Sequence, residues 1–445
     1  MSRTLFGTDG IRGRVGQHPM TAEFALRLAS AAGRVLAPEG GKVLIGKDTR
    51  VSGYMFESAL EAGFVAVGMD VLLVGPMPTP GIAHLTRTLG ADVGVVISAS
   101  HNPYEDNGIK FFDAHGSKLS DAIESSIEAR LVEPPVTCES SSLGRAKRVE
   151  NALDVYQEFC LSTVPAGLRL DGLKIVIDCS HGAAYKVAPR VLSALGAEIV
   201  PIGCSPNGRN INDGCGSTRP ELMRLTTKGV GADLGIALDG DGDRVLMVDH
   251  RGELVDGDQL LWILANAWQE AGRLRGPVVG TLMTNLGLEH SLRKLGIDFL
   301  RAKVGDRYVL EMLHEKGGCL GGETSGHLLC LDKTTTGDGL VSALQVLAVM
   351  KQSGRTLADL TAGMPRYPQK LVNVRIVEKL DLGQNPVIRS AVAEAEQRLG
   401  ARGRVVLRAS GTEPVVRVMV EGEDGVEVER LANDIAASVR GAAAG

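Results

Sequence analysis

The most specific chemical signal in this 445-residue sequence is a run of three aspartates separated by single glycines. The run reads Asp-Gly-Asp-Gly-Asp-Arg, with carboxylates at Asp239, Asp241 and Asp243, and it lies between two strongly apolar stretches. Carboxylates this close repel one another unless a divalent cation lies among them, and oxygen ligands without histidine or cysteine suit magnesium. An EF-hand calcium loop is excluded, because Arg244 and His250 replace its required glycine and glutamate. The run therefore predicts a magnesium site, with a solvated acidic turn as the alternative.

A serine loop follows another apolar run, at residues 93–97. The segment 97–112 reads ISASHNPYEDNGIKFF. Open α/β sheets bind ligands at the carboxyl ends of their strands, so Ser100 is placed where a hydroxyl could react. Serine is a poor nucleophile unless a base or a metal assists it, and Lys110, His101 and Ser98 are nearby candidates. No G-x-S-x-G segment is present here, which argues against a serine hydrolase; a polar turn without chemistry is the alternative.

A glycine-rich loop at residues 321–327 has the side chains that a sugar site needs. Glu323 and Ser325 can accept and donate hydrogen bonds to vicinal hydroxyls, and His327 can exchange a proton near neutral pH. Asp338 could orient that imidazole if the fold returns it to the loop. The alternative is an ordinary turn.

The fourth loop, RASGTEPVVR at residues 408–417, has the composition of a phosphate site. Backbone amides and hydroxyls in the turn, with guanidinium groups on either side, can surround a phosphate. The predicted phosphate-binding residues are Arg408, Ser410, Gly411, Thr412 and Arg417. An ordinary hairpin turn is again the alternative.

The elements that must position the first three loops repeat along the chain. Each unit is a β-branched run, an amphipathic helix that ends near glycine, and a second apolar run. The three units cover residues 43–74, 173–202 and 278–302. This spacing predicts parallel or mixed sheets covered by helices, in three similar α/β domains.

The last stretch differs, since three predicted strands at 370–377, 404–408 and 415–421 accompany two helices at 387–399 and 426–439. Two helices on one small sheet indicate a C-terminal α+β domain. We place the domains at residues 1–155, 156–256, 257–366 and 367–445. Because each domain contains one of the four loops, the loops are expected to meet in a central cleft.

Composition limits the classes of function. Lys and Arg total 48 against 53 Asp and Glu, so the net charge of -5 lacks the basic surface of a nucleic-acid binder. No apolar run approaches the roughly 18 residues that span a bilayer, and the first ten residues have no apolar signal-peptide core. The seven cysteines form no C-x-x-C pair, so neither a disulfide framework nor a zinc site is indicated. We therefore expect a cytoplasmic protein without nucleic-acid or membrane partners.

Taken together, the loops resemble the α-D-phosphohexomutase superfamily, and the resemblance extends through nearly the whole chain. Its motifs here are FGTDGIRG (6–13), ISASHNP (97–103), DGDGDR (239–244), VGDRYV (304–309), GE-x-SGH (322–327), KTTTGDG (333–339) and RxSGTEP (408–414). The resemblance implies an isomerase that transfers a phosphoryl group within a sugar. A sugar bisphosphate is then the implied activator, and a phosphosugar is the substrate.

The resemblance also assigns roles to individual residues. Ser100 would be the phosphoserine, and a phosphate oxygen on Ser100 would join Asp239, Asp241 and Asp243 in holding one Mg²⁺ ion. The substrate would be phosphorylated to a bisphosphorylated sugar, turn around, and return its other phosphate to the enzyme. Arg12, Lys110 and Arg244 could neutralise the remaining charge. Lys110 and His327 are the implied general acid and base.

The GTDGIRG and VGDRYV segments favour the branch of the superfamily that interconverts glucosamine 6-phosphate and glucosamine 1-phosphate for UDP-N-acetylglucosamine and peptidoglycan precursors. A mutase for glucose or mannose phosphates is the alternative, because Thr324 lies where those mutases often have methionine and the glucosamine branch often has glutamine. A noncatalytic binder of sugar phosphates is disfavoured by the intact Ser100, Lys110 and aspartate set. The sequence is compatible with a homodimer.

Overall fold

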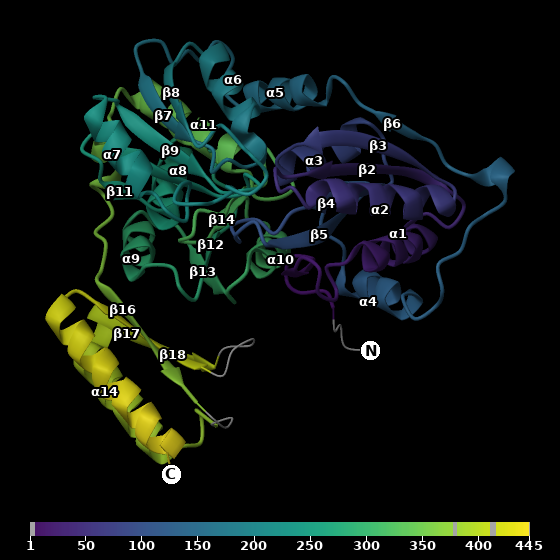
Figure 1. Ribbon diagram of the computed structural model, residues 1–445. Coiled ribbons are helices and arrows are strands. Elements are labelled where there is room, and N and C mark those ends of the chain that lie inside the picture. The colour runs from purple at the N-terminus through teal and green to yellow at the C-terminus, as the bar shows by residue number, and fades with distance from the viewer. Residues whose placement is uncertain (1–4, 377–380, 410–414, 445) are drawn as a thin grey trace.

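Four sheets organise the part of the chain that the structure describes. The structure is a computed structural model, and it describes residues 5–376, 381–409 and 415–444. Three mixed sheets form a joined body, and the fourth belongs to a C-terminal domain that projects from it (Figure 1). This is the architecture predicted from the sequence, with three α/β domains built on mixed sheets and a small C-terminal α+β domain.

The first sheet has the strand order β1-β5-β4-β2-β3-β6. Its antiparallel strands are β1 (Ile11–Arg14) and β5 (Asp106–Asp113), which join the parallel strands β4 (Val93–Ile97), β2 (Gly41–Lys47), β3 (Met69–Pro76) and β6 (Ala146–Arg148). Its helices are α1 (Ala22–Leu36), α2 (Gly53–Ala66), α3 (Thr79–Thr88) and α4 (Asp121–Arg130). The β4–β5 pairing brings the end of the serine loop back beside its beginning.

The second sheet has the order β11-β10-β9-β7-β8. Its strands are β7 (Lys174–Asp178), β8 (Glu198–Ile202), β9 (Leu234–Leu238), β10 (Val245–Asp249) and β11 (Leu254–Val255), and its helices are α5 (Ala152–Ser162), α6 (Val187–Ala194) and α7 (Glu221–Gly229). The helix expected within the 173–202 unit is divided into a 3₁₀ turn, Ala183–Tyr185, and α6. Pro189 is accommodated because it lies in the first turn of α6, where its missing N–H is not needed.

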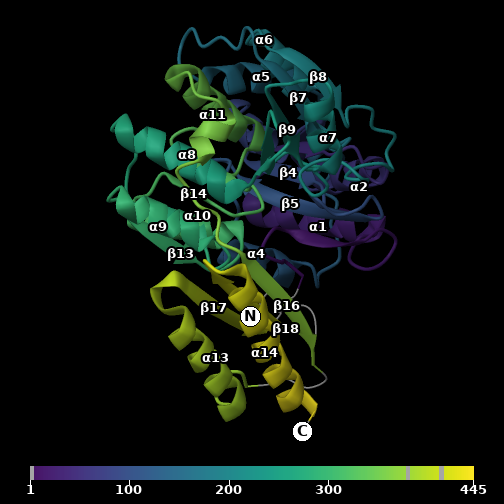
Figure 2. The ribbon, with the colours of Figure 1, turned by 90° about the vertical axis from the view of Figure 1, so that its left-hand side faces the viewer.

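The third sheet has the order β13-β12-β14-β15, and the fourth has the order β16-β18-β17. The third contains β12 (Val278–Thr281), β13 (Phe299–Ala302), β14 (Leu320–Gly322) and β15 (Leu328–Cys330), with α8 (Gly257–Glu270), α9 (Leu286–Lys294), α10 (Asp306–Lys316), α11 (Gly339–Ser353) and α12 (Leu357–Thr361). The fourth contains β16 (Gln369–Arg375), β17 (Gly403–Ala409) and β18 (Val415–Gly422), all antiparallel, with α13 (Pro386–Leu399) and α14 (Gly425–Ala444) on one face (Figure 2).

The hydrophobic cores divide the molecule into the same two parts. One continuous cluster includes Leu44 of the first sheet, Ile175 of the second and Leu328 of the third. The C-terminal domain has its own cluster, around Val418 and Leu431. Within residues 5–444, apart from the stretches left undescribed, no helix combines the length and apolar character that crossing a bilayer requires.

Candidate active site

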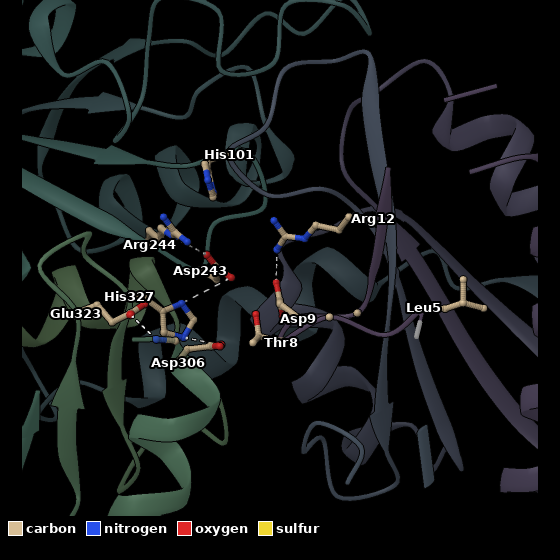
Figure 3. Close-up of a pocket in the computed structure, with 13 residues that line it drawn as sticks. Leu5, Thr8, Asp9, Arg12, His101, Asp243, Arg244, Asp306, Glu323 and His327 are labelled. Atoms are coloured by element: carbon tan, nitrogen blue, oxygen red, sulfur yellow. Dashed lines mark hydrogen bonds and ion pairs between the residues drawn. The ribbon is translucent and has the colours of Figure 1, made fainter. Parts of the chain in front are cut away.

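A cavity of about 380 Å³ lies where the first three sheets meet. Its walls come from the Gly7–Arg12 segment before and within β1, from the β9–β10 loop, and from α10 and the β14–β15 loop (Figure 3). Asp9 and Arg12 line one side, and Arg244, Glu323 and His327 line the other. The described residues of the C-terminal domain do not line this cavity.

The three aspartates converge at the wall of this cavity, where Asp243 is part of the lining. One carboxylate oxygen from each of Asp239, Asp241 and Asp243 lies within 4.8 Å of the others, and all three side chains are buried. The loop closes the antiparallel β9–β10 hairpin, in which Leu238 pairs with Val245. The sequence placed them in this loop, and the fold turns all three inward.

The electrostatics of the cluster is asymmetric. Burial opposes ionisation of Asp241, but the Lys110 ammonium lowers the pKa of that carboxyl. Burial, together with the Asp243 and Asp241 carboxylates, raises the pKa of Asp239 well above its ordinary value. The Oδ1 atoms of Asp241 and Asp243 are buried and have no hydrogen-bond partner. The protein therefore neutralises this set of carboxylate oxygens only in part, and the set fits a hard divalent cation.

Ser100 lies directly against this cluster. Its hydroxyl donates a hydrogen bond of 2.7 Å to Asp239 Oδ2, and the residue is 1% exposed. The Oγ atom is also 3.3 Å from His101 Nδ1. Burial, followed by the Arg244 and Arg12 guanidinium groups, lowers the pKa of His101 to about 4, so this imidazole is neutral at neutral pH.

Lys110 is the cation of the cluster. It lies on β5, and the antiparallel pairing of β1 with β5 brings the segment around Arg12 beside it. Lys110 Nζ is 2.8 Å from Asp241 Oδ2, 2.7 Å from Asp9 Oδ2 and 3.9 Å from Asp243 Oδ2. Burial alone would lower the pKa of Lys110, but these carboxylates raise it above its ordinary value. Lys110 is therefore positively charged at neutral pH in this structure.

His327 faces the cluster from the third sheet. Its Nδ1 atom is 3.7 Å from Asp243 Oδ2, and its Nε2 atom is 3.4 Å from Asp306 Oδ2. Burial alone would lower the pKa of this imidazole, but the two carboxylates raise it to about 9. At neutral pH His327 is protonated and can act as a proton donor.

The sequence suggested that Asp338 could orient His327, but in the structure the Asp338 carboxylate has other partners. Its oxygens accept from the Tyr156 hydroxyl at 2.8 Å and from the Val341 N–H at 2.9 Å. The reason is that Asp338 is the N-cap of α11, a position at which aspartate satisfies a helix amide. The carboxylates that face the imidazole come from Asp243 and Asp306 instead.

Arg12 and Arg244 enter the cavity from opposite walls (Figure 3). Arg12 pairs with Asp9, and its Nη1 atom reaches the carbonyl of Ala99 at 3.5 Å. Arg244 Nε is 3.9 Å from Asp243 Oδ1. Both guanidinium groups could therefore contact an anion in the cavity.

The β14–β15 loop contributes Glu323 and His327 to the cavity. Glu323 Oε1 accepts a hydrogen bond of 3.0 Å from the Gly305 amide. Ser325 is exposed and does not line the cavity. Thr324 also lies outside the lining, because its hydroxyl donates to the buried Asp258 Oδ2 at 2.8 Å. The Thr324 side chain, on which the alternative choice of sugar substrate was based, is therefore directed into the protein.

The predicted phosphate residues lie on the C-terminal domain. Arg408 and Arg417 are directly opposite each other in the β17–β18 pairing. Burial, and then the neighbouring Arg417 guanidinium, lowers the pKa of Arg408. Ser410, Gly411 and Thr412 fall outside the described residues.

The sequence did not single out Asp9, Asp306 or Lys118, yet the structure places Asp9 and Asp306 in the cavity lining and Lys118 in contact with both. Lys118 Nζ is 2.6 Å from Asp9 Oδ1 and also contacts Asp306, so it connects the carboxylates that face Lys110 and His327. Burial opposes ionisation of Asp9, but Lys110, Lys118 and Arg12 lower its pKa well below the ordinary value. The GTDGIRG and VGDRYV segments contained the signal, because they include Asp9 and Asp306.

Comparison with known families matches the chain in four successive pieces. The phosphoglucomutase/phosphomannomutase alpha/beta/alpha domains I, II and III match residues 3–134, 154–252 and 256–367, and the C-terminal domain of the same family matches residues 371–438.

Full-length relatives agree with these matches. The chain is 59% identical to the phosphoglucosamine mutase of Methylococcus capsulatus over 99% of both chains. It is 56% identical to that of Thiobacillus denitrificans over 100% of this chain and 99% of the relative. A solved phosphoglucomutase/phosphomannomutase family protein from Burkholderia thailandensis superposes with a TM-score of 0.81 at 25% identity, covering 99% and 98% of the two chains. With its aspartate cluster, adjoining serine and four matched domains, the chain belongs to the phosphoglucomutase/phosphomannomutase family.

Proposed function

We propose that this protein is an isomerase that interconverts glucosamine 6-phosphate and glucosamine 1-phosphate through a phosphoserine at Ser100. The observation that carries the proposal is the Ser100 hydroxyl, which lies 2.7 Å from Asp239 in the three-aspartate cluster. Relatives at 56 to 59% identity over the full length are phosphoglucosamine mutases, which supports this choice of sugar.

One Mg²⁺ ion would be held by Asp239, Asp241 and Asp243, together with a phosphate oxygen on Ser100. The unpartnered Oδ1 atoms and the raised pKa of Asp239 support this assignment. When bound, the ion would neutralise phosphate charge during transfer.

Two phosphoryl transfers then account for the isomerisation. The phosphoryl group of Ser100 passes to the free sugar hydroxyl at C1 or C6, whose proton goes to a base, and the Ser100 oxygen is protonated as it is released. The bisphosphorylated sugar turns around, its other phosphoryl group passes to the Ser100 oxygen, whose proton goes to a base, and the freed sugar oxygen is protonated. Lys110 and His327, which are both protonated at neutral pH, would act first as acids toward the freed oxygen, and the neutral group left after that donation would act as the base toward the attacking hydroxyl. Because little bond-making is left to the protein, positioning and charge account for most of the catalysis.

Fixed charges in the cavity suit this sequence of steps. Arg12 and Arg244 face the cavity from opposite walls and could contact the transferring phosphoryl group. Glu323, in the cavity lining, would bind the sugar hydroxyls, together with Ser325 from an exposed position in the same loop. The non-reacting phosphate would be bound by the C-terminal residues Arg408, Ser410, Gly411, Thr412 and Arg417. A sugar bisphosphate would act as activator by loading Ser100 before the first turnover.

The alternative, a mutase for glucose or mannose phosphates, gains no support from Thr324. The Thr324 hydroxyl donates its hydrogen bond to Asp258, away from the cavity. We therefore retain glucosamine phosphate as the substrate.

Turnover measured with Mg²⁺ and a catalytic amount of sugar bisphosphate tests this assignment. We expect kcat/KM for glucosamine 1-phosphate to exceed the values for glucose and mannose 1-phosphates, and Ser100→Ala to abolish all three activities. Ser126→Ala, at an exposed serine on α4, is the matched control and should be fully active. A higher kcat/KM for glucose or mannose would reject the sugar assignment, and substantial activity of Ser100→Ala would reject the phosphoserine.

A further inference from the structure

Two carbonyl groups of the serine loop are held by side chains from two different sheets. Asn212 Nδ2 donates to the carbonyl of Ser100 at 2.9 Å and to that of Asn102 at 3.0 Å. Arg50 Nη2 donates to the same two oxygens, at 3.2 and 2.5 Å. Arg50 follows β2 in the first sheet, whereas Asn212 lies between β8 and α7 in the second. We call Arg50 and Asn212 the carbonyl clamp.

The clamp acts on a strained residue. Ser100 has a φ of 51°, in the left-handed region that residues other than glycine rarely adopt. Such a conformation persists only where the surroundings fix it. The two carbonyls that the clamp binds flank His101, so the clamp fixes the peptide that follows Ser100. The direction of the Ser100 side chain depends on that peptide.

Asn212 is also hydrogen-bonded toward the start of the β9–β10 loop that carries Asp239, Asp241 and Asp243, which we call the metal loop. Its N–H donates to the Ser180 carbonyl at 2.9 Å, and the Ser180 hydroxyl donates to the carbonyl of Leu238. Leu238 is the residue immediately before Asp239. Asn212 therefore connects the backbone that carries Ser100 with the backbone that carries the first aspartate.

The contact between the two loops leaves no spare room. A Cβ atom placed on Gly240 would lie 2.6 Å from the Ser100 carbonyl oxygen and 2.8 Å from Asn212 Nδ2. Only glycine allows the metal loop to approach the serine loop and Asn212 this closely. The spacing of the Ser100 hydroxyl from Asp239 is thus set by packing as well as by hydrogen bonds.

We propose that Asn212 is a positioning residue, whose amide holds the serine loop in register with the metal loop so that the Ser100 hydroxyl stays beside Asp239. This inference rests on the proposed phosphoserine role of Ser100. Asn212 does not line the cavity, so it acts through the backbone and does not touch the substrate. It is a better test site than Arg50, whose fully buried guanidinium is paired with Asp48.

Two substitutions separate the amide from the backbone of Asn212, which has a φ of 60°. Asn212→Asp keeps the size and the tolerance for this conformation, but turns an oxygen toward two carbonyl oxygens. Asn212→Gly keeps the backbone freedom and removes the side chain. We expect kcat for glucosamine 1-phosphate to fall about 10- to 100-fold in both variants, because a displacement of ~1 Å can cost that much. KM should be unchanged, and loading of Ser100 from glucosamine 1,6-bisphosphate, followed by intact mass, should slow by the same factor.

The control is Asn207→Asp, at an exposed asparagine of the same segment, which should keep the wild-type kcat. Wild-type kcat in Asn212→Gly would show that only the backbone conformation matters and would overturn the inference. A raised KM with unchanged kcat, or a lowered Tm alone, would overturn it too. Activity of Ser100→Ala would refute the proposed function instead, whereas an inactive Ser100→Ala beside fully active Asn212 variants would refute only this role.

Discussion

The three-sheet body and the C-terminal domain are packed in different ways. In the body, one hydrophobic cluster runs through all three sheets, from Leu44 to Leu328, and the reactive side chains lie where those sheets meet. The C-terminal domain packs α13 and α14 on its own sheet, around Val418. The difference indicates that the groups that need fixed distances share one core, whereas the predicted phosphate loop lies on a separately packed unit.

Polar contacts connect the two parts. Glu421 on β18 is buried and accepts hydrogen bonds from the Leu286 amide at 2.7 Å and from Arg404 Nε at 2.7 Å. Arg404 also donates to the carbonyls of Leu282 and Thr284, at 2.9 and 2.6 Å. Hydrogen bonds weaken steeply when their geometry is displaced, whereas the three sheets of the body share one apolar core. This junction should therefore be the weaker part of the fold.

The largest expected effect comes from the aspartate cluster in the body. Asp239→Asn removes one carboxylate of the proposed Mg²⁺ site and weakens the hydrogen bond that the Ser100 hydroxyl donates. We expect turnover to fall at least about 100-fold. The metal-free Tm should stay the same or rise, because burial and neighbouring carboxylates make the Asp239 charge unfavourable.

Thermal unfolding with and without Mg²⁺ checks this prediction. The wild-type Tm should rise with Mg²⁺, and that of Asp239→Asn should not. Asp434→Asn, at an exposed position on α14, should behave like the wild type. A Mg²⁺-dependent rise in the Tm of Asp239→Asn would show that the cation binds elsewhere.

A smaller effect concerns a buried carboxyl near the junction. Asp258 accepts from Thr324 and from the Asn285 amide, and burial, reinforced by Asp256, raises its pKa to about 7. The unfolded carboxyl titrates near 3.8, so between these values the folded state binds more protons. The stability contributed by this group is therefore present below about pH 4 and is lost as the pH rises to 7.

Asp258→Asn should remove this pH dependence. Relative to wild type, the free energy of unfolding of the Asp258→Asn body should rise by about 4 kcal/mol between pH 4 and pH 8. Urea unfolding at several pH values measures the difference, and Asp298→Asn, at an exposed site in the same domain, is the control. A difference that does not vary with pH would contradict the raised pKa.

The smallest effect should be confined to the C-terminal domain. Glu421→Gln removes the charge that pairs with Arg404 but keeps the shape of the side chain. We expect a loss of about 1–2 kcal/mol, seen in calorimetry as a lower midpoint for that domain with the body transition unchanged. Glu429→Gln, which breaks only an exposed pair with Lys370, should change neither midpoint. An equal shift of both transitions would show that the two parts unfold as one unit.

The sequence predicted most of the fold because its signals are local. Apolar runs, amphipathic helices and the glycines between them located the strand-helix-strand units, and strand ends located Ser100 and the aspartates. The partners of these groups could not be predicted in the same way. Lys118 and Asp306 are 188 positions apart, and only the meeting of two sheets places them together. Asn212 belongs to none of the singled-out loops, and its contacts with the serine loop lie 110 and 112 positions away.

The phosphoryl group on Ser100 is the central claim, and intact-mass spectrometry with peptide mapping tests it most directly. The purified protein would be incubated with Mg²⁺ and glucosamine 1,6-bisphosphate, then freed of ligand. We expect the added mass of one phosphoryl group, located on Ser100, absent from Ser100→Ala, and exchanged for the labelled phosphoryl group when glucosamine 1-phosphate with ¹⁸O in its phosphoryl oxygens is added. A phosphoryl group on another residue, or turnover by a protein that never gains this mass, would contradict the claim.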